Sequence, residues 1–170
     1  MFYNKCMRQV WNTLTCLQCK EKIIQVSDTI LNPNIDSKLK QKILDDTWMN
    51  TICPHCGALI RSIAPCIYKD HEKKLLIHVK RKFDVQESGY HQRFVSTKEA
   101  FRELILIYEL GLDDQYIMHI RKILKKKHQK VFFIQGDDEI LVFECDGEIK
   151  MVKNPAQKLP DRGECITYEI

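Results

Sequence analysis

Cysteine is the side chain that best equips this sequence for chemistry, with eight cysteines among 170 residues. Four of them form two pairs with two residues between the thiols, and these are Cys16 with Cys19 and Cys53 with Cys56. This spacing lets a tight turn direct both sulfur atoms at one ion, and two such turns complete a tetrahedral shell of four thiolates. Gly57 suits the positive φ expected directly after the second pair. The pattern predicts one structural Zn²⁺ per chain with these four cysteines as its ligands.

A shell of four thiolates has no open position for a water molecule, so the predicted zinc ion is structural rather than catalytic. The segment Cys53-Pro54-His55-Cys56 also has the residue order of the redox dithiol in some thioredoxin-fold oxidases. That interpretation requires a helix that begins at the first cysteine and lowers its pKa. Gly57 and Pro65 leave no room for such a helix, and a redox site leaves the other cysteine pair unexplained.

The remaining cysteines, Cys6, Cys66, Cys145 and Cys165, stand alone. We expect the last three to be unbridged and unreactive, because nothing near them in sequence lowers their pKa. The N-terminal residues contain neither the uninterrupted apolar region nor the small-residue cleavage site of a signal peptide. No stretch approaches the ~20 apolar residues that a membrane span needs. We therefore expect a cytoplasmic protein with reduced cysteines and no membrane partner.

The overall composition argues for a folded chain without a strong preference for nucleic acid. An apolar share of 44% and a charged share of 29% exclude the disordered and low-complexity classes. The net charge of +4 is only mildly cationic. Arginine, the fork-shaped donor used to recognise bases and phosphates, is much rarer than lysine. We therefore expect no specific recognition of nucleic acid.

The stretch between the two cysteine pairs predicts structure of its own. β-branched residues between 22 and 30 are typical of a strand, and Asn32-Pro33-Asn34 interrupts it. A short amphipathic helix follows, with Asp36 or Ser37 placed to cap it. Its apolar residues are Ile35, Leu39 and Ile43. After the second pair, strands are predicted over 59–67 and 75–79, which completes a zinc-ribbon-like antiparallel β module with a helical insertion.

Two helices are predicted next. Ser96-Thr97-Lys98-Glu99 is a capping box, Gly111 ends the first helix, and Asp113 caps the second. Their apolar faces comprise Phe101, Leu104, Ile105 and Tyr108 in the first helix and Ile117, Ile120 and Leu124 in the second. A DNA-reading helix-turn-helix would place Asp113 and Asp114 against phosphates, because a recognition helix puts its N-terminal residues at the groove. We therefore predict a packed αα-hairpin.

Three strand-like runs follow the helices, over 131–134, 140–143 and 148–152. Asp146-Gly147 is a strong hairpin signal between the last two, and 165–169 can add a final strand. The predicted fold is therefore α+β. We divide it into the β module over residues 13–80 and an αα-hairpin with a β-meander over residues 81–170, packed together as one unit.

Charge is unevenly distributed in the second half. Arg121–Lys130 holds six cations in ten residues, and Asp137–Glu148 holds six carboxylates in twelve. The two runs can neutralise each other across the fold. Lys122, Lys125 and Lys126 are the candidates for weak, non-specific contact with nucleic acid.

Several short motifs together resemble a known family. They are Asn32-Pro33, Asn50, Cys53-Pro54-His55-Cys56-Gly57, Pro65, Tyr68-Lys69-Asp70 and Gly111-Leu112-Asp113-Asp114. In this combination the chain resembles the CpXC-domain proteins from Thr13 to Leu124. The family's four cysteines carry over onto Cys16, Cys19, Cys53 and Cys56, whereas Leu17 stands where the family has proline. The resemblance implies zinc and a bacterial, intracellular setting, and it implies no reaction.

These observations favour a zinc-tied binding or adaptor module with an unknown protein partner over an enzyme. Two alternatives stay open. One is an enzyme whose site lies between the β module and the helical half, and the other is weak, non-specific binding of nucleic acid.

Overall fold

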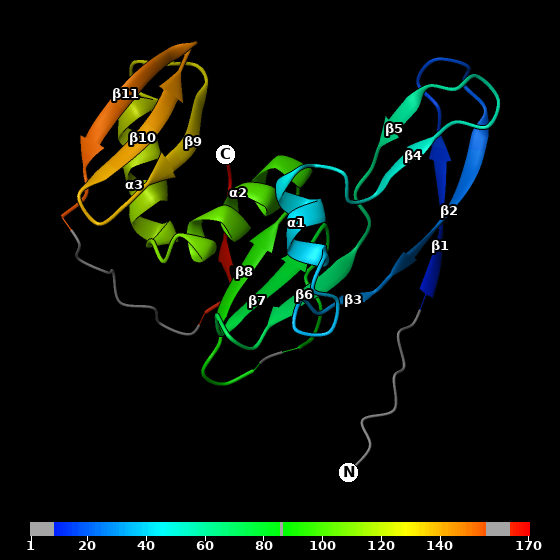
Figure 1. Cartoon of the computed structure of the whole chain (residues 1–170), viewed down its shortest axis with the longest axis horizontal. Helices are drawn as coiled ribbons and strands as arrows, with labels where there is room; N and C mark the ends of the chain where they lie inside the picture. The colour runs from blue at the N-terminus through cyan, green and yellow to red at the C-terminus, as the bar shows by residue number, and fades with distance from the viewer. Residues whose placement is uncertain (1–8, 86, 156–163) are drawn as a thin grey trace.

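The computed structural model describes residues 9–85, 87–155 and 164–170 and has the predicted α+β architecture (Figure 1). Cys6 lies outside the described residues. In chain order the elements are β1 (Gln9–Thr15), β2 (Lys22–Asp28), β3 (Ile30–Leu31), α1 (Leu39–Leu44), β4 (Asn50–Ile52), β5 (Leu59–Arg61), β6 (Cys66–Asp70), β7 (Leu75–Val79), β8 (His91–Val95), α2 (Lys98–Glu109), α3 (Asp114–Leu124), β9 (Val131–Gly136), β10 (Ile140–Cys145), β11 (Glu148–Lys153) and β12 (Ile166–Thr167).

Two short hairpins form one end of the molecule (Figure 1). β1 pairs with β2, β4 pairs with β5, and both pairs are antiparallel. Each hairpin is a sheet of its own, so no strand ladder joins them within the described part of the chain. We call these two hairpins, residues 9–28 and 50–61, the knuckle lobe. β2 continues through Thr29 directly into β3, so the backbone connects the first hairpin to the rest of the fold.

A five-stranded sheet lies at the centre of the fold, in the order β12-β8-β7-β6-β3. Only β6 and β7 pair in antiparallel fashion, and the other neighbours are parallel. The single strand predicted over 59–67 is wrong, because the chain leaves the hairpin after Arg61 and enters the central sheet at Cys66. Pro65 lies in the break and has no N–H group to give to a ladder. The boundary predicted between residues 80 and 81 falls between β7 and β8, which are neighbours in this sheet.

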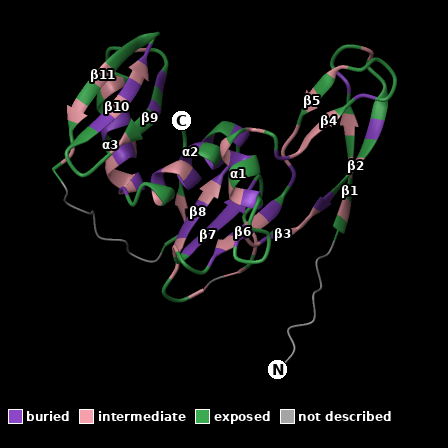
Figure 2. Cartoon of the chain, in the orientation of Figure 1, coloured by how far each residue is buried: buried purple, intermediate pink, exposed green. Residues whose placement is uncertain are grey.

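The main core lies between this sheet and helices α1 and α2, where buried residues concentrate in Figure 2. The Phe101 ring makes edge contacts with Trp48 and Tyr68, at centroid distances of 5.4 Å and 5.6 Å.

Thr97, rather than the predicted Ser96, caps α2, and its side chain accepts from the Ala100 N–H group. The predicted cap at Asp36 or Ser37 is wrong, because α1 begins at Leu39 after Lys38 and no side chain caps it. Asp36 Oδ1 instead accepts from the Lys38 N–H group at 3.0 Å, and Ile35 stays 73% exposed.

The C-terminal half follows the sequence pattern more closely. Asp113 caps α3 by accepting from the Tyr116 N–H group, and Gly111 ends the α2 segment at φ +71°. The meander β9-β10-β11 forms as predicted. Asp146 and Gly147 have φ values of +52° and +89°, as a type I′ hairpin turn requires. The last strand, β12, pairs with β8 and is shorter than the predicted 165–169.

Two buried arginines tie α3 to the rest. Arg93 Nε lies 2.5 Å from Asp114 Oδ2, Arg93 Nη2 lies 2.9 Å from Asp114 Oδ1, and both residues are buried. Arg121 bonds to Glu103, which also accepts from the Tyr168 hydroxyl. These pairs connect α3 to β8, to α2 and to the segment that follows β12.

The Asp114→Asn substitution tests the first of these ties. It leaves the buried Arg93 charge without its carboxylate, so we expect a loss of about 3–5 kcal/mol in the free energy of unfolding. Urea unfolding followed by far-UV circular dichroism measures this. Glu148→Gln removes an exposed ion pair with Lys150 and should leave the urea midpoint in place. An equal response of the two variants would contradict the assigned role of the buried pair.

Candidate metal centre

The two knuckle turns are built alike. In the first, Cys16 N–H donates to Glu21 O at 2.9 Å and Lys20 N–H donates to Cys16 O at 2.9 Å. In the second, Cys53 N–H donates to Ala58 O at 2.8 Å and Gly57 N–H donates to Cys53 O at 2.9 Å. Lys20 and Gly57 occupy equivalent positions, with φ of +65° and +74°. Glycine adopts this conformation without strain, whereas lysine does so at a cost.

These turns bring together the four sulfur atoms that the sequence singles out. The Sγ atoms of Cys16, Cys19, Cys53 and Cys56 all lie within 4.8 Å of one another. Two of these contacts join the two knuckles, 3.6 Å from Cys16 to Cys56 and 3.6 Å from Cys19 to Cys53. Four sulfur atoms at ~2.3 Å from a central ion would lie about 3.8 Å apart in a tetrahedron. The donor set therefore fits a tetrahedral metal ion, with two ligands from each knuckle.

The protonation states of the thiols also suit a cation. The backbone N–H group of Cys19 contributes most to lowering the pKa of Cys16 to about 6. The backbone N–H group of Glu21 acts in the same direction on Cys19, but burial and the neighbouring thiols raise the pKa of Cys19 to about 12. One cysteine therefore ionises readily, and the negative charge of its thiolate disfavours ionisation of a second cysteine. A bound cation removes this opposition, because it attracts every thiolate in the cluster.

The centre supplies most of the core of the knuckle lobe. The buried cluster there consists of Cys16, Ile23 and Cys53, with only four partly buried neighbours. The lobe is mostly exposed or half-buried in Figure 2, in contrast to the central sheet. Three buried side chains remove little apolar surface from water. The relative position of the two hairpins therefore depends chiefly on their four sulfur atoms.

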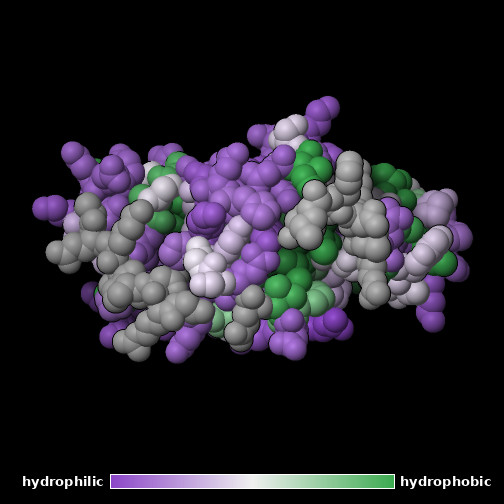
Figure 3. Space-filling view, turned by 90° about the horizontal axis from the view of Figure 1, so that it is seen from below, coloured by the Kyte–Doolittle hydropathy of each residue, from purple (hydrophilic) through white to green (hydrophobic). Residues whose placement is uncertain are grey.

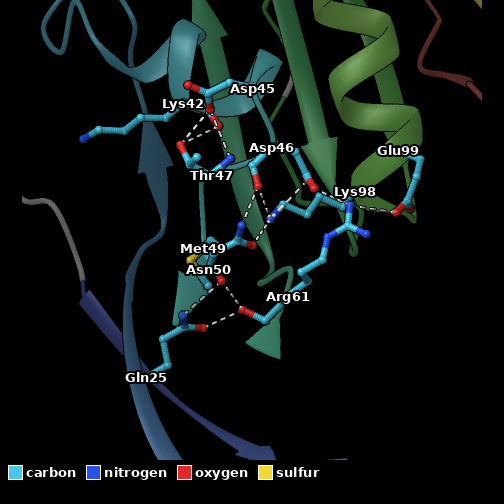
Figure 4. A network of polar contacts seen from close by, with 11 residues as sticks. Gln25, Lys42, Asp45, Asp46, Thr47, Met49, Asn50, Arg61, Lys98 and Glu99 are labelled. Atoms are coloured by element: carbon cyan, nitrogen blue, oxygen red, sulfur yellow. Dashed lines mark hydrogen bonds and ion pairs between the residues drawn. The ribbon is translucent and has the colours of Figure 1, made fainter. Parts of the chain in front are cut away.

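Side-chain hydrogen bonds connect the hairpins where they meet the body (Figure 4). Gln25 of β2 donates from Nε2 to Met49 O at 3.2 Å. Ser62 Oγ lies 2.7 Å from Gln25 Oε1 and 2.8 Å from Met49 O. These contacts link the first hairpin to the two ends of the second.

Charged groups then connect the second hairpin to α2 (Figure 4). Lys98 Nζ donates to Asn50 Oδ1 at 2.6 Å and lies 3.4 Å from Asp46 Oδ1. Arg61 pairs with Asp46 and lies 3.6 Å from Glu99. The Lys98 side chain is buried, although the network to which it belongs lies near the surface. The knuckle lobe is thus anchored to the start of α2 by polar contacts.

The three candidate lysines for nucleic acid lie apart from this centre. Lys122, Lys125 and Lys126 are exposed at the C-terminal end of α3. The neighbouring Arg121 is instead buried against Glu103, so one of the six predicted cations is absent from the surface. Asp114, which a DNA-reading helix would have placed against phosphates, is buried against Arg93. The acidic run contacts the basic run at Asp146, which lies 3.3 Å from His128 Nδ1 and accepts from the Lys130 N–H group at 2.8 Å.

Sequence reasoning missed these buried charges although a signal was present. Arg121 follows Ile117 by four positions and precedes Leu124 by three, so it belongs to the apolar stripe of α3. Glu103 has the same signal, since it follows Ala100 by three positions and precedes Ile107 by four. No comparable local signal marks Arg93, whose partner is distant in sequence.

Cys66, Cys145 and Cys165 are unbridged, as expected. Cys66 and Cys145 are buried, and Cys165 is half-buried. Burial raises the pKa of the Cys66 thiol to about 12 and raises the pKa values of Cys145 and Cys165 above their usual range. His55, inside the second knuckle, is exposed. None of these residues adds a ligand to the cluster.

The fold and the cluster define an α+β protein with a four-cysteine centre at two C-x-x-C knuckles. The model of the CpXC protein family matches residues 14–121, which is more than half of the chain, so the chain belongs to that family. The match includes all four cysteines and ends within α3, before the meander. Neither a curated protein nor a solved structure is similar enough to the chain to count as a match.

Among the described residues, no helix combines the length and the apolar character that crossing a membrane requires.

Thiol labelling tests this division of the cysteines. In metal-stripped, reduced protein without denaturant, we expect the exposed Cys56 to react with a maleimide much faster than Cys66 and Cys145, because burial limits access to these two thiols and raises their pKa. Mass spectrometry of timed samples identifies the modified residues. Rapid, stoichiometric labelling of Cys66 would contradict this and would point to a nucleophile.

Proposed function

We propose that the chain is an intracellular zinc-binding adaptor, in which one structural Zn²⁺ at Cys16, Cys19, Cys53 and Cys56 fixes a surface that binds a protein partner. The observation that carries the proposal is the four-sulfur cluster between two hairpins that share no ladder. Four thiolates favour zinc over the harder cations, and they close its coordination shell. Such an ion stabilises structure and leaves no site for a reacting water, which favours a binding role over catalysis.

Support for a partner comes from the surface of the knuckle lobe. Six of its large apolar side chains are exposed, namely Trp11, Leu17, Ile24, Val26, Ile52 and Leu59. Trp11 lies directly opposite Val26, and Ile52 lies directly opposite Leu59, so these residues form adjacent pairs. Figure 3 shows that apolar patches interrupt an otherwise largely hydrophilic face. Adjacent exposed apolar residues of this kind mark interaction surfaces.

Metal analysis tests the zinc proposal. We expect protein purified under reducing conditions to hold one zinc per chain. Structural zinc contributes roughly 10–16 kcal/mol of apparent binding energy in small fingers, so its loss should unfold the knuckle lobe. Cys53→Ser should abolish zinc binding and remove amide-exchange protection from β1, β2, β4 and β5, while the central sheet stays protected.

Cys165→Ser is the matched control, since Cys165 is a free, half-buried cysteine outside the cluster. This variant should retain zinc, and it should retain amide-exchange protection in the knuckle lobe as well as in the central sheet. Protein that contains no metal after purification under reducing conditions would contradict the proposal. A native Cys16–Cys19 or Cys53–Cys56 disulfide would have the same consequence.

A second candidate function is weak binding of nucleic acid, which the exposure of Lys122, Lys125 and Lys126 favours. With Arg121 buried, five cations of the basic run stay available. Contact by all five would give a log-log salt slope of about −4.5 on duplex DNA.

We expect a slope shallower than about −3 and micromolar or weaker affinity near physiological salt, because the net charge is small. Fluorescence anisotropy with two unrelated duplexes, titrated across salt, measures both quantities. The triple Lys→Glu variant at the three candidate positions should flatten the slope, and Lys42→Glu in the distant α1 should not. Nanomolar affinity, or a clear preference for one duplex, would establish specific recognition instead.

A further inference from the structure

A groove runs along the knuckle lobe between the first knuckle and β5, and its volume is about 660 Å³. Apolar side chains from both walls line it, including Leu14, Leu17, Leu59, Ile60 and Ile63. Leu17 is 85% exposed and Leu59 is 59% exposed, so both offer most of their surface to a ligand. We call this feature the knuckle groove.

The charges along the groove have a single sign. Arg61 and Lys80 are the charged residues of its lining, and within the described chain no carboxylate belongs to that lining. Lys20 adds a third cation at the knuckle, because its Nζ donates to Leu17 O at 2.7 Å. Arg61 forms ion pairs with Asp46 and Glu99, whereas the Lys80 side chain is exposed. The groove therefore combines an aliphatic floor with a cationic border, which complements an acidic ligand.

The same lining disfavours nucleic acid as the occupant. Proteins that bind single strands stack the bases on aromatic side chains. No aromatic residue is part of the described lining, and its uncharged polar members are Thr15, Gln18 and Ser62. Aliphatic side chains contribute by burial against other aliphatic groups, which a peptide supplies and a phosphate backbone does not.

We propose that the knuckle groove binds an extended segment of a partner protein that carries aliphatic side chains flanked by aspartate or glutamate. This inference rests on the proposed adaptor function and names the chemistry of the partner. Aliphatic side chains of the segment pack on Leu17 and Leu59, and its carboxylates lie near Lys20 and Lys80.

The groove also depends on the metal centre. Cys16 itself belongs to its lining, and β5 begins three residues after Cys56. The two walls come from hairpins that share no ladder, so the cluster sets the distance between them. Removal of the metal should therefore abolish binding of the segment even where the central sheet stays folded.

Selection from a phage-displayed library of random peptides tests the proposal, with the zinc-loaded full chain as the bait. We expect selected peptides to be enriched in leucine, isoleucine or valine together with aspartate and glutamate. A fluorescein-labelled synthetic copy of the most enriched peptide is then the probe, and its Kd is measured by anisotropy. Zinc content is measured on the same samples.

Two substitutions with matched controls locate the site. Leu59→Ser should weaken binding by about fivefold to tenfold, the effect of losing one buried aliphatic contact. Ile149→Ser is the control, because Ile149 is 55% exposed on the distant β11 and should have no effect. Lys80→Glu should also weaken binding, whereas Lys122→Glu should not.

The outcomes separate this inference from the function on which it rests. Zinc-loaded protein that selects no peptide, or selects basic or aromatic ones, overturns the groove proposal and leaves the metal centre standing. Peptides that bind equally well to Leu59→Ser overturn the groove and retain an adaptor that uses another surface. Tight, Leu59-dependent binding of labelled oligothymidylate would also overturn it. Absence of zinc would instead overturn the proposed function itself.

Discussion

The convergence of four thiols is the constraint on which the knuckle lobe depends. Two hairpins that share no ladder, and whose buried apolar cluster consists of Cys16, Ile23 and Cys53, must nevertheless hold a fixed relative position. In a larger domain, apolar burial would supply this, but three side chains cannot offset the entropy of ordering two hairpins. In the proposed function, a cation bound by the four thiolates would replace a hydrophobic core with a few strong bonds. The groove follows from that placement, because residues of both hairpins line it.

The remainder of the molecule is stabilised in a different way. The central sheet and its two helices bury a continuous apolar cluster that reaches the α3 and meander region. Buried charges fix where the peripheral parts attach to it. Lys98 connects the second hairpin to the start of α2, and Arg93 connects β8 to α3. Each connection consists of directional hydrogen bonds, so it specifies an orientation that apolar packing alone would leave loose.

Local signals in the sequence were sufficient for the features whose causes are local. The knuckles, the caps at Gly111 and Asp113 and the Asp146-Gly147 turn each require particular residues within a few positions, and they were predicted. The strand over 59–67 was not, because β5 and β6 find their partners in different sheets. The cap of α2 shifted by one residue, because Ser96 and Thr97 can both cap a helix and local sequence does not decide between them. α1 begins after Lys38 without a side-chain cap, so no capping signal marks its start.

For the candidate site too, the sequence predicted the features with local causes and missed those that depend on tertiary structure. The spacing of the four cysteines was enough to group them, whereas the groove depends on how two hairpins approach each other, which no local pattern encodes. The basic run illustrates a third case. Arg121 was counted among the surface cations of the run. It is buried instead, because it belongs to the apolar stripe of α3 and pairs with Glu103, which is distant in sequence.

The pairing of β12 with β8 has a consequence for synthesis on the ribosome. Ile166 lies beside Arg93, so the sheet stays incomplete until α2, α3 and the whole meander have been translated. Throughout that interval, the nascent chain presents β8 with one row of peptide groups unpaired, together with Glu103 lacking the Tyr168 hydroxyl. An open strand edge of this kind is a substrate for holdase chaperones and for wrong pairing between neighbouring nascent chains. The demand for such protection ends when the segment carrying Tyr168 emerges and docks.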